Sequence, residues 1–212
     1  EICDAIKEEF GIARSHVVIS SSHTHSAPDL VSELSNIFSE PLNDAERAAC
    51  LAHREQLKTG ALLSVRKAIS SMQPAKLLYA RGAVDFAVNR RVLNDNRWSG
   101  FGVQADGVVD HSVPLIAVEG LDGTLRGMIF NYACHCTSIN PDVNEVNYDW
   151  VGYACDKLEQ QHPDTVAICT IGCGADQNPN PRGETAMAEA HGAKLAKKIN
   201  RLLETGMKPL QG

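Results

Sequence analysis

Apolar positions recur at helical spacing in four segments of the chain. They predict helices over residues 1–10, 44–72, 149–161 and 184–203. Gly11 and Pro74 end the first two of these helices, and Asn43 or Asp44 caps the start of the second.

Short runs rich in β-branched and aromatic residues predict the strands. They lie at residues 15–21, 76–84, 113–118, 124–133 and 165–171. The dipeptide Asp122-Gly123 is a hairpin signal, while residues 23–41 and 172–183 are predicted as loops. This order predicts an α/β fold class, with mixed β-sheet(s) flanked by helices, in a single domain over residues 1–212.

Composition narrows the class of protein. The chain has 212 residues, of which 43% are hydrophobic and 22% charged, as in ordinary soluble globular proteins. Its net charge of −6 argues against nucleic acid as a partner, because phosphate binding needs an excess of Lys and Arg. No run approaches the ~18 apolar residues of a transmembrane segment. Because the chain begins with Glu1 rather than Met, we expect a segment of a longer chain, either cytoplasmic or secreted.

The sharpest candidate for chemistry is the run Ser22-His23-Thr24-His25-Ser26-Ala27-Pro28, where a predicted strand ends. Side chains alternate along a strand, so His23 and His25 are expected to point to the same side. Two imidazoles make half of a catalytic Zn²⁺ site, which takes about three protein ligands and keeps a position open. The alternative is a pair of surface or capping histidines.

His135 is the candidate for a third imidazole. It lies in Ala133-Cys134-His135-Cys136-Thr137-Ser138, at the end of another apolar strand. On a strand, Cys134 and Cys136 face away from His135, so the three groups do not converge easily. We interpret these thiols, like most of the seven cysteines, as small buried side chains rather than ligands or a disulfide framework, which weakly favours a reducing compartment.

Two further segments carry charged candidates. Asp149, at the start of a predicted helix, is a helix cap, a metal ligand or a carboxylate that orients a ligand histidine. Arg90, in Asn89-Arg90-Arg91, is either a clamp for a carboxylate or phosphate group or a solvated surface residue.

A Gly-rich run from Gly172 to Pro181 joins a predicted strand to a predicted helix and contains Gly174, Asp176 and Asn178. Such a turn is either a plain loop or a source of backbone N–H groups for an anion or oxyanion. It lacks the Lys-Ser/Thr ending of a phosphate-binding loop, so nucleotide binding is not predicted.

Taken in order, these segments resemble the N-terminal catalytic domain of the neutral/alkaline non-lysosomal ceramidase family, in particular a shorter bacterial member. The resemblance covers nearly the whole chain, and its matching runs are Ser22–Pro28, Asn89-Arg90, Ala133–Ser138, Asp149–Ala154 and Asp176–Asn180. It implies a zinc-dependent amidohydrolase of sphingolipid metabolism, acting on a lipid or small-molecule N-acyl substrate and cleaving the amide between a fatty acid and a sphingoid base.

The resemblance also implies roles for individual residues. His23 and His135 map onto zinc ligands. Apart from the resemblance, Asp149 or residues outside this segment are expected to complete the ligand set. His25 maps onto the histidine beside the metal-bound water, and Arg90 onto an arginine that lines the site.

The Gly-rich run adds three expected site residues and one departure from the family pattern. Asp176 and Asn178 are expected in catalysis, and Gly174 in substrate binding. The family has Ser where this chain has Asn178, and Gly where it has Ala175, so a serine-dependent step is missing. The family also completes its zinc shell with a Glu and a Tyr that nothing in this chain matches, so the remainder of a longer chain is expected to complete the site.

The resulting hypothesis is that zinc lowers the pKa of a bound water towards about 7, the hydroxide attacks an amide carbonyl, and His25 passes the proton to the leaving amine. Three alternatives remain. One is a metal hydrolase of another ester or amide substrate, and another is a catalytically degenerate relative that acts as a binding module. The third, a barrel amidohydrolase, needs about 250 residues in strand–helix repeats, which the hairpin at Asp122-Gly123 does not fit.

Overall fold

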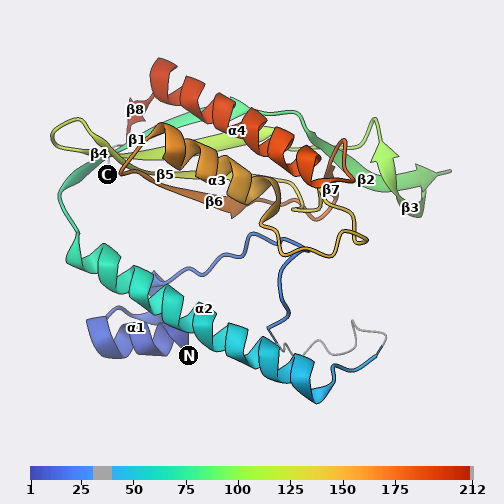
Figure 1. Cartoon of the computed structure of the whole chain (residues 1–212). Coiled ribbons are helices and arrows are strands. Elements are labelled where there is room, and N and C mark those ends of the chain that lie inside the picture. The colour runs from blue at the N-terminus through green and yellow to red at the C-terminus, as the bar shows by residue number, and fades with distance from the viewer. Residues whose placement is uncertain (31–39, 211–212) are drawn as a thin grey trace. The chain divides into compact units, whose positions relative to one another are not determined.

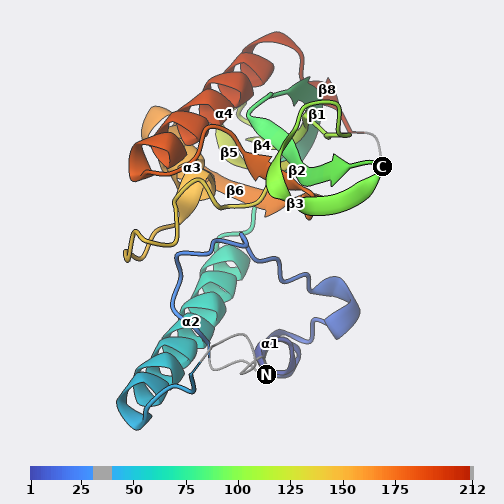
Figure 2. The same cartoon turned by 90° about the vertical axis from the view of Figure 1, so that its right-hand side faces the viewer.

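The computed structural model describes residues 1–30 and 40–210, which fall into two compact units (Figures 1 and 2). One unit comprises Glu1–Ile19 and Ala27–Gln73, and the other comprises Ser20–Ser26 and Pro74–Gly212. The single domain expected over residues 1–212 stays a prediction. Residues 31–39 of the predicted loop 23–41 lie outside the described residues.

The first unit contains the helices α1 (Ile2–Phe10) and α2 (Asp44–Ser70) and the short 3₁₀ helix η1 (Arg14–His16). Both α-helices confirm the sequence prediction. Gly11 ends α1 in a left-handed conformation with φ 69°, which glycine adopts without steric cost. At the start of α2, the Asn43 side chain accepts a hydrogen bond of 3.0 Å from the Glu46 N–H. Across the described residues, no helix is both long and apolar enough to cross a membrane.

The second unit is built on a five-stranded sheet in the order β6-β5-β4-β1-β8. Its strands are β1 (Ala75–Ala83), β4 (Ser112–Gly120), β5 (Leu125–Tyr132), β6 (Val166–Ile171) and β8 (Lys208–Pro209). Strands β5 and β6 are parallel, and the other neighbours are antiparallel. The mixed sheet confirms the predicted α/β class, and the turn at Asp122-Gly123 joins β4 to β5 as expected.

Helices α3 (Asp149–Gln161) and α4 (Thr185–Thr205) pack on one face of this sheet (Figure 1). The alternation of β4 and β5 turns their large apolar side chains toward these helices. The core that results is formed by Val113, Leu115, Met128, Phe130, Tyr132, Trp150, Leu158, Leu195 and Ile199. On the opposite face, Ile129 and Ile168 remain exposed.

A three-stranded sheet in the order β3-β2-β7 extends the second unit, and it was not predicted. It consists of β2 (Ala87–Asn94), β3 (Arg97–Gln104) and β7 (Gln177–Pro179). The hairpin turn between β2 and β3 has positive φ at both Asp95 and Asn96, 50° and 60°, which is the pattern of a type I′ turn. Strand β7 lies within the predicted loop 172–183 and pairs with β2.

The strand predicted over residues 15–21 is wrong. Residues 14–16 form η1, residues 17–21 form no regular element, and Val18 is 91% exposed. A β-branched run becomes a strand only where it pairs with a neighbour and packs one face. Among the described residues, the only bridge in this part of the chain joins Thr24 to Cys136.

Candidate metal centre

Residues 20–26 are held beside the end of β5 by contacts that involve the segment from Cys136 to Asn147. Thr24 forms a parallel bridge with Cys136 and donates its hydroxyl to the Asn147 carbonyl at 2.8 Å. The Cys136 thiol donates to the Ser22 carbonyl at 2.8 Å. His23, with a φ of 58°, is in the left-handed region, which is uncommon for a residue other than glycine. Tertiary contacts and this turn, rather than strand alternation, therefore orient the histidine pair.

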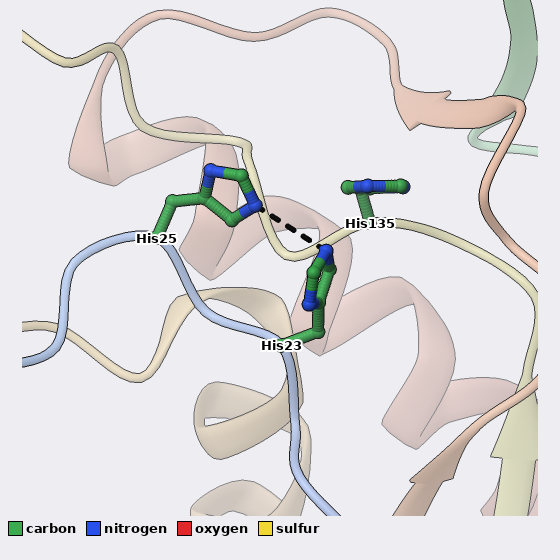
Figure 3. A group of neighbouring side chains, drawn as sticks. All are labelled: His23, His25 and His135. Carbon is green, nitrogen blue, oxygen red and sulfur yellow. Dashed lines mark hydrogen bonds between the residues drawn. The ribbon is translucent and has the colours of Figure 1, made fainter. Parts of the chain in front are cut away.

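Three imidazoles meet at this point (Figure 3). His23 and His25 lie in the segment of residues 20–26, and His135 follows the end of β5. The Nε2 atoms of His23 and His25 are 3.4 Å apart, and one ring nitrogen from each of the three residues lies within 4.8 Å of the others. The ring of His23 is central, with its centroid 4.9 Å from that of His25 and 4.6 Å from that of His135.

The ring of His135 is held by a backbone contact. Its Nδ1 lies 2.6 Å from the Gly174 carbonyl, and because a carbonyl only accepts, Nδ1 carries the proton in this contact. A neutral His135 then leaves Nε2 with a free lone pair. The Trp150 indole donates to the His135 carbonyl at 2.9 Å, so helix α3 fixes the backbone of the same residue. Metal-binding histidines commonly have such a partner on the other ring nitrogen.

The protein environment favours the neutral form of His25 and of His135. Burial, together with the positive charges of His23 and Arg90, lowers the pKa of His25 from its ordinary value of 6.5. Burial is also the largest cause that lowers the pKa of His135, against the opposite effect of the hydrogen bond to Gly174. His23 and His25 are exposed to solvent, whereas His135 is buried. Neutral imidazole is the form that binds a metal ion.

The donor set fits a zinc ion. Imidazole nitrogens bind Zn²⁺ at about 2.0–2.1 Å, and one ring nitrogen of each of the three histidines lies within 4.8 Å of the others. His23 and His135 are therefore close enough to share one ion, with His25 beside it. The adjacent thiols are unsuited as ligands, because burial raises the pKa of Cys134 and of Cys136 and keeps both protonated. Within the described part of the chain, the three histidines form the only cluster of potential ligands of this kind.

Asp149 lies outside this group of three histidines. It is fully buried, and its carboxylate accepts hydrogen bonds from the N–H groups of Ser138 at 2.8 Å and Trp150 at 2.7 Å. Its φ of 53° places it in the left-handed region at the start of α3. These contacts join the start of the helix to the segment after His135, and the metal-ligand role of Asp149 stays a prediction.

Arg90, Asp176 and Asn178 are brought together by the pairing of β2 with β7. The Arg90 guanidinium donates to the Asn178 Oδ1 at 3.3 Å and to the Ala175 carbonyl at 3.1 Å. The backbone N–H of Arg90 donates to the Asp176 carbonyl at 2.7 Å. The positive charge of Arg90 contributes to the lowered pKa of His25 and of His135, so this cluster adjoins the histidines.

The sequence analysis did not predict two residues that contact the candidate site. Thr137 donates its hydroxyl to the Asn178 Oδ1 at 3.3 Å, and Trp150 holds His135 as described above. Thr137 lies two residues after the candidate ligand His135, and this spacing could have indicated its place in the site. Gly174, expected to bind substrate, is buried and supplies the carbonyl that orients His135.

The fold and the site together define a mixed α/β protein with a three-histidine group of metal-binding geometry beside an Arg–Asn cluster. The chain belongs to the neutral/alkaline non-lysosomal ceramidase family, whose N-terminal model matches residues 1–191. This confirms the resemblance seen in the sequence.

Individual relatives agree with this membership. The chain is 25% identical over 197 residues to neutral ceramidase B of Dictyostelium discoideum, which is 87% of this chain and 27% of that protein. It has the fold of a neutral ceramidase from Pseudomonas aeruginosa, with a TM-score of 0.77, 18% identity and coverage of 100% of this chain and 35% of that one. A ceramidase structure described as complexed with C2 gives a TM-score of 0.81, 17% identity and coverage of 100% and 34%. The chain thus spans about a third or less of the length of these relatives.

Proposed function

We propose that this chain forms the metal-binding part of a zinc-dependent amidohydrolase that cleaves a ceramide-like N-acyl lipid. The observation that carries the proposal is the convergence of His23, His25 and His135 within 4.8 Å. Membership of the ceramidase family supports the amide of a fatty acid and a sphingoid base as the bond that is cleaved.

In this proposal, His23 and His135 hold the ion through ring nitrogens, and the Gly174 carbonyl keeps His135 in the tautomer that can bind it. A bound zinc ion supplies Lewis acidity, which lowers the pKa of a coordinated water towards about 7. His25, kept neutral by its surroundings, accepts the proton of the attacking water and returns it to the leaving amine. The products are a free carboxylic acid and an amine.

Arg90 and Asn178 are proposed to bind and orient the polar part of the substrate. Arg90 presents a guanidinium whose Nε and one Nη are already held by Ala175 and Asn178, so its remaining N–H groups have a fixed direction. Asp176, whose carboxylate lies 3.4 Å from the Asn89 side-chain amide, fixes the strand that carries Arg90. A fixed cation beside the imidazoles can meet an amide oxygen as it gains negative charge.

The test is zinc content and hydrolysis in the full-length protein, with a short-chain N-acyl sphingosine as substrate. We expect about one zinc ion per chain in the wild type, and loss of both zinc and hydrolysis in His23→Ala and His135→Ala. His25→Ala is expected to keep its zinc, while its rate of hydrolysis falls by about a hundredfold or more. His16→Ala removes an exposed histidine of η1 and serves as the matched control.

Full zinc occupancy in His23→Ala would contradict the assignment of the ligand. A second candidate, a zinc-binding relative without hydrolytic activity, is favoured by Asn178, which offers no hydroxyl where the family has Ser. A wild-type protein that binds zinc but hydrolyses neither amide nor ester substrates would support that candidate instead.

A further inference from the structure

The β2–β3 hairpin carries an exposed apolar surface that the histidine site does not use. In Figure 1 it extends beyond the ends of α3 and α4. Its large apolar side chains are solvent-exposed, at 46% for Leu93, 60% for Trp98, 65% for Phe101 and 55% for Val103. The rings of Trp98 and Phe101 pack edge to face, with centroids 5.9 Å apart. Leu93 pairs with Trp98 across the hairpin, so three of these exposed side chains are neighbours, and neighbouring exposed apolar side chains often mark an interaction surface.

The charge of this hairpin is opposite to that of the whole chain. Residues 87–104 contain the three arginines Arg90, Arg91 and Arg97 against the single acid Asp95, which gives +2, whereas the chain as a whole carries −6. Arg91 and Arg97 are exposed, and the Arg90 guanidinium lies 4.7 Å from the centre of the Phe101 ring. Positive charge and aromatic surface therefore coincide on one element.

The base of the hairpin adjoins the candidate site. A hollow of about 170 Å³ opens there, lined by Val88, Phe101, Gly102, Val103 and Pro179, with Asn178, Asn180 and Arg182 as its polar members. Asn178 is also the partner of Arg90 in the site. The mainly apolar lining joins the exposed aromatic surface to the polar cluster beside the histidines, and its volume suits part of an alkyl chain rather than a whole ligand.

We propose that the β2–β3 hairpin binds the surface of an anionic lipid membrane. Trp98 and Phe101 would enter the headgroup region, where aromatic side chains are favoured, while Arg91 and Arg97 meet lipid phosphates. A second copy of the hairpin is disfavoured as the occupant, because the exposed charges of Arg91, Arg97 and Asp95 leave each surface with a net positive charge and the two copies repel each other. Membrane binding would help catalysis by giving access to a lipid substrate, and that benefit rests on the proposed function. The membrane binding itself does not depend on the proposed function.

Trp98 provides a direct probe of this contact. Trp150, the other tryptophan among these 212 residues, is fully buried, and the difference in emission between the wild type and Trp98→Phe isolates the signal of Trp98 on adding vesicles. With vesicles of phosphatidylcholine and phosphatidylglycerol, we expect a blue shift and protection from acrylamide quenching, weakened by salt. Pure phosphatidylcholine vesicles should bind more weakly. Trp98→Phe should remove the change in tryptophan emission, while the variant still co-sediments with the vesicles.

Variants separate the contributions to binding. Phe101→Ser should weaken vesicle binding about tenfold or more, because a large apolar side chain is no longer transferred out of water. Arg91→Gln with Arg97→Gln should abolish the preference for anionic vesicles. Leu121→Ala, at the exposed turn between β4 and β5, is the matched control and should bind like the wild type. Circular dichroism checks that each variant is folded.

Unchanged Trp98 emission with both kinds of vesicle would overturn the proposal. So would a blue shift that depends on protein concentration without lipid, which indicates self-association. The measurement needs neither zinc nor turnover, and His135→Ala should bind vesicles as the wild type does. Failure of membrane binding is therefore distinguishable from failure of the proposed hydrolase function.

Discussion

At the scale of single residues, the candidate site depends on close backbone approaches as much as on its histidines. A Cβ atom at Gly174 would lie 2.7 Å from the backbone nitrogen of Cys134 and 3.0 Å from its Cα. Glycine is therefore needed for the Gly174 carbonyl to reach the Nδ1 of His135. The glycine acts on the ring through its backbone, independently of any contact with substrate.

Gly174→Ala is expected to weaken zinc binding roughly 10–100-fold, as the loss of a partner that orients a ligand histidine usually does. The added methyl group must displace the loop or the Cys134 backbone, and either shift disturbs the contact with His135. Competition with a fluorescent zinc chelator measures the affinity. Gly206→Ala, where a Cβ has no neighbour within 4 Å, is the control and should leave the affinity unchanged. Wild-type affinity in Gly174→Ala would refute this account.

At the scale of elements, the packing of α3 against α4 supports the backbone of the site. A Cβ at Gly192 of α4 would lie 2.6 Å from the Cβ of Tyr153 and 3.0 Å from the carbonyl oxygen of Trp150, so the two helices approach closely there. Trp150 in turn donates to the His135 carbonyl. The close contact between α3 and α4 at Gly192 therefore positions Trp150, which in turn fixes the backbone of His135.

Two glycine-to-alanine changes should therefore act in opposite directions on the free energy of unfolding. Gly192→Ala overpacks the contact between α3 and α4 and should destabilise the protein by about 1–3 kcal/mol. Gly60→Ala lies within α2, where a Cβ meets nothing within 4 Å, and should stabilise that helix by about 0.5–1 kcal/mol. Urea titration followed by circular dichroism measures both. Equal signs for the two variants would show that helix propensity, rather than packing, dominates at Gly192.

Prediction from the sequence succeeded best where structure is local. The four helices and the β4–β5 turn were predicted because caps, apolar spacing and turn residues act over a few positions. Strands β2 and β3 were missed, although Asn94-Asp95-Asn96 is a turn signal, because their exposed aromatic residues and arginines do not alternate as a half-buried strand does. The strand predicted over residues 15–21 failed for the converse reason, since its β-branched residues have strand propensity but no ladder partner among the described residues.

At the scale of the whole molecule, several histidines make folding sensitive to pH. Burial is the largest cause that lowers the pKa of His25, His135 and His191 from the ordinary value of 6.5. The folded state therefore binds protons less readily at these rings than the unfolded chain does. Their contribution to stability is present above about pH 6.5 and is lost progressively as the pH falls below that value.

In the zinc-free protein, the urea midpoint should be similar at about pH 8 and pH 7 and lower at about pH 5.5. His135→Gln, which cannot be protonated in this range, should show a smaller decrease between pH 7 and pH 5.5 than the wild type. Carboxylates with a lowered pKa, such as Asp85 beside Lys194, are protonated only at lower pH and do not cause the decrease in the urea midpoint between pH 7 and pH 5.5. A midpoint that rises on acidification to pH 5.5 would contradict the prediction.

The sequence by itself determined the residue types for chemistry, the helices and the α/β class, because these follow from side-chain identity and from interactions between near neighbours. Only the tertiary structure decided how the imidazoles meet. His23 and His25 are separated from His135 by more than a hundred residues, and the bridge from Thr24 to Cys136 brings them together. Strand alternation was expected only to turn His23 and His25 to the same side. The Gly174 and Trp150 contacts that fix His135 are likewise non-local, since they depend on which loop and which helix pack against it.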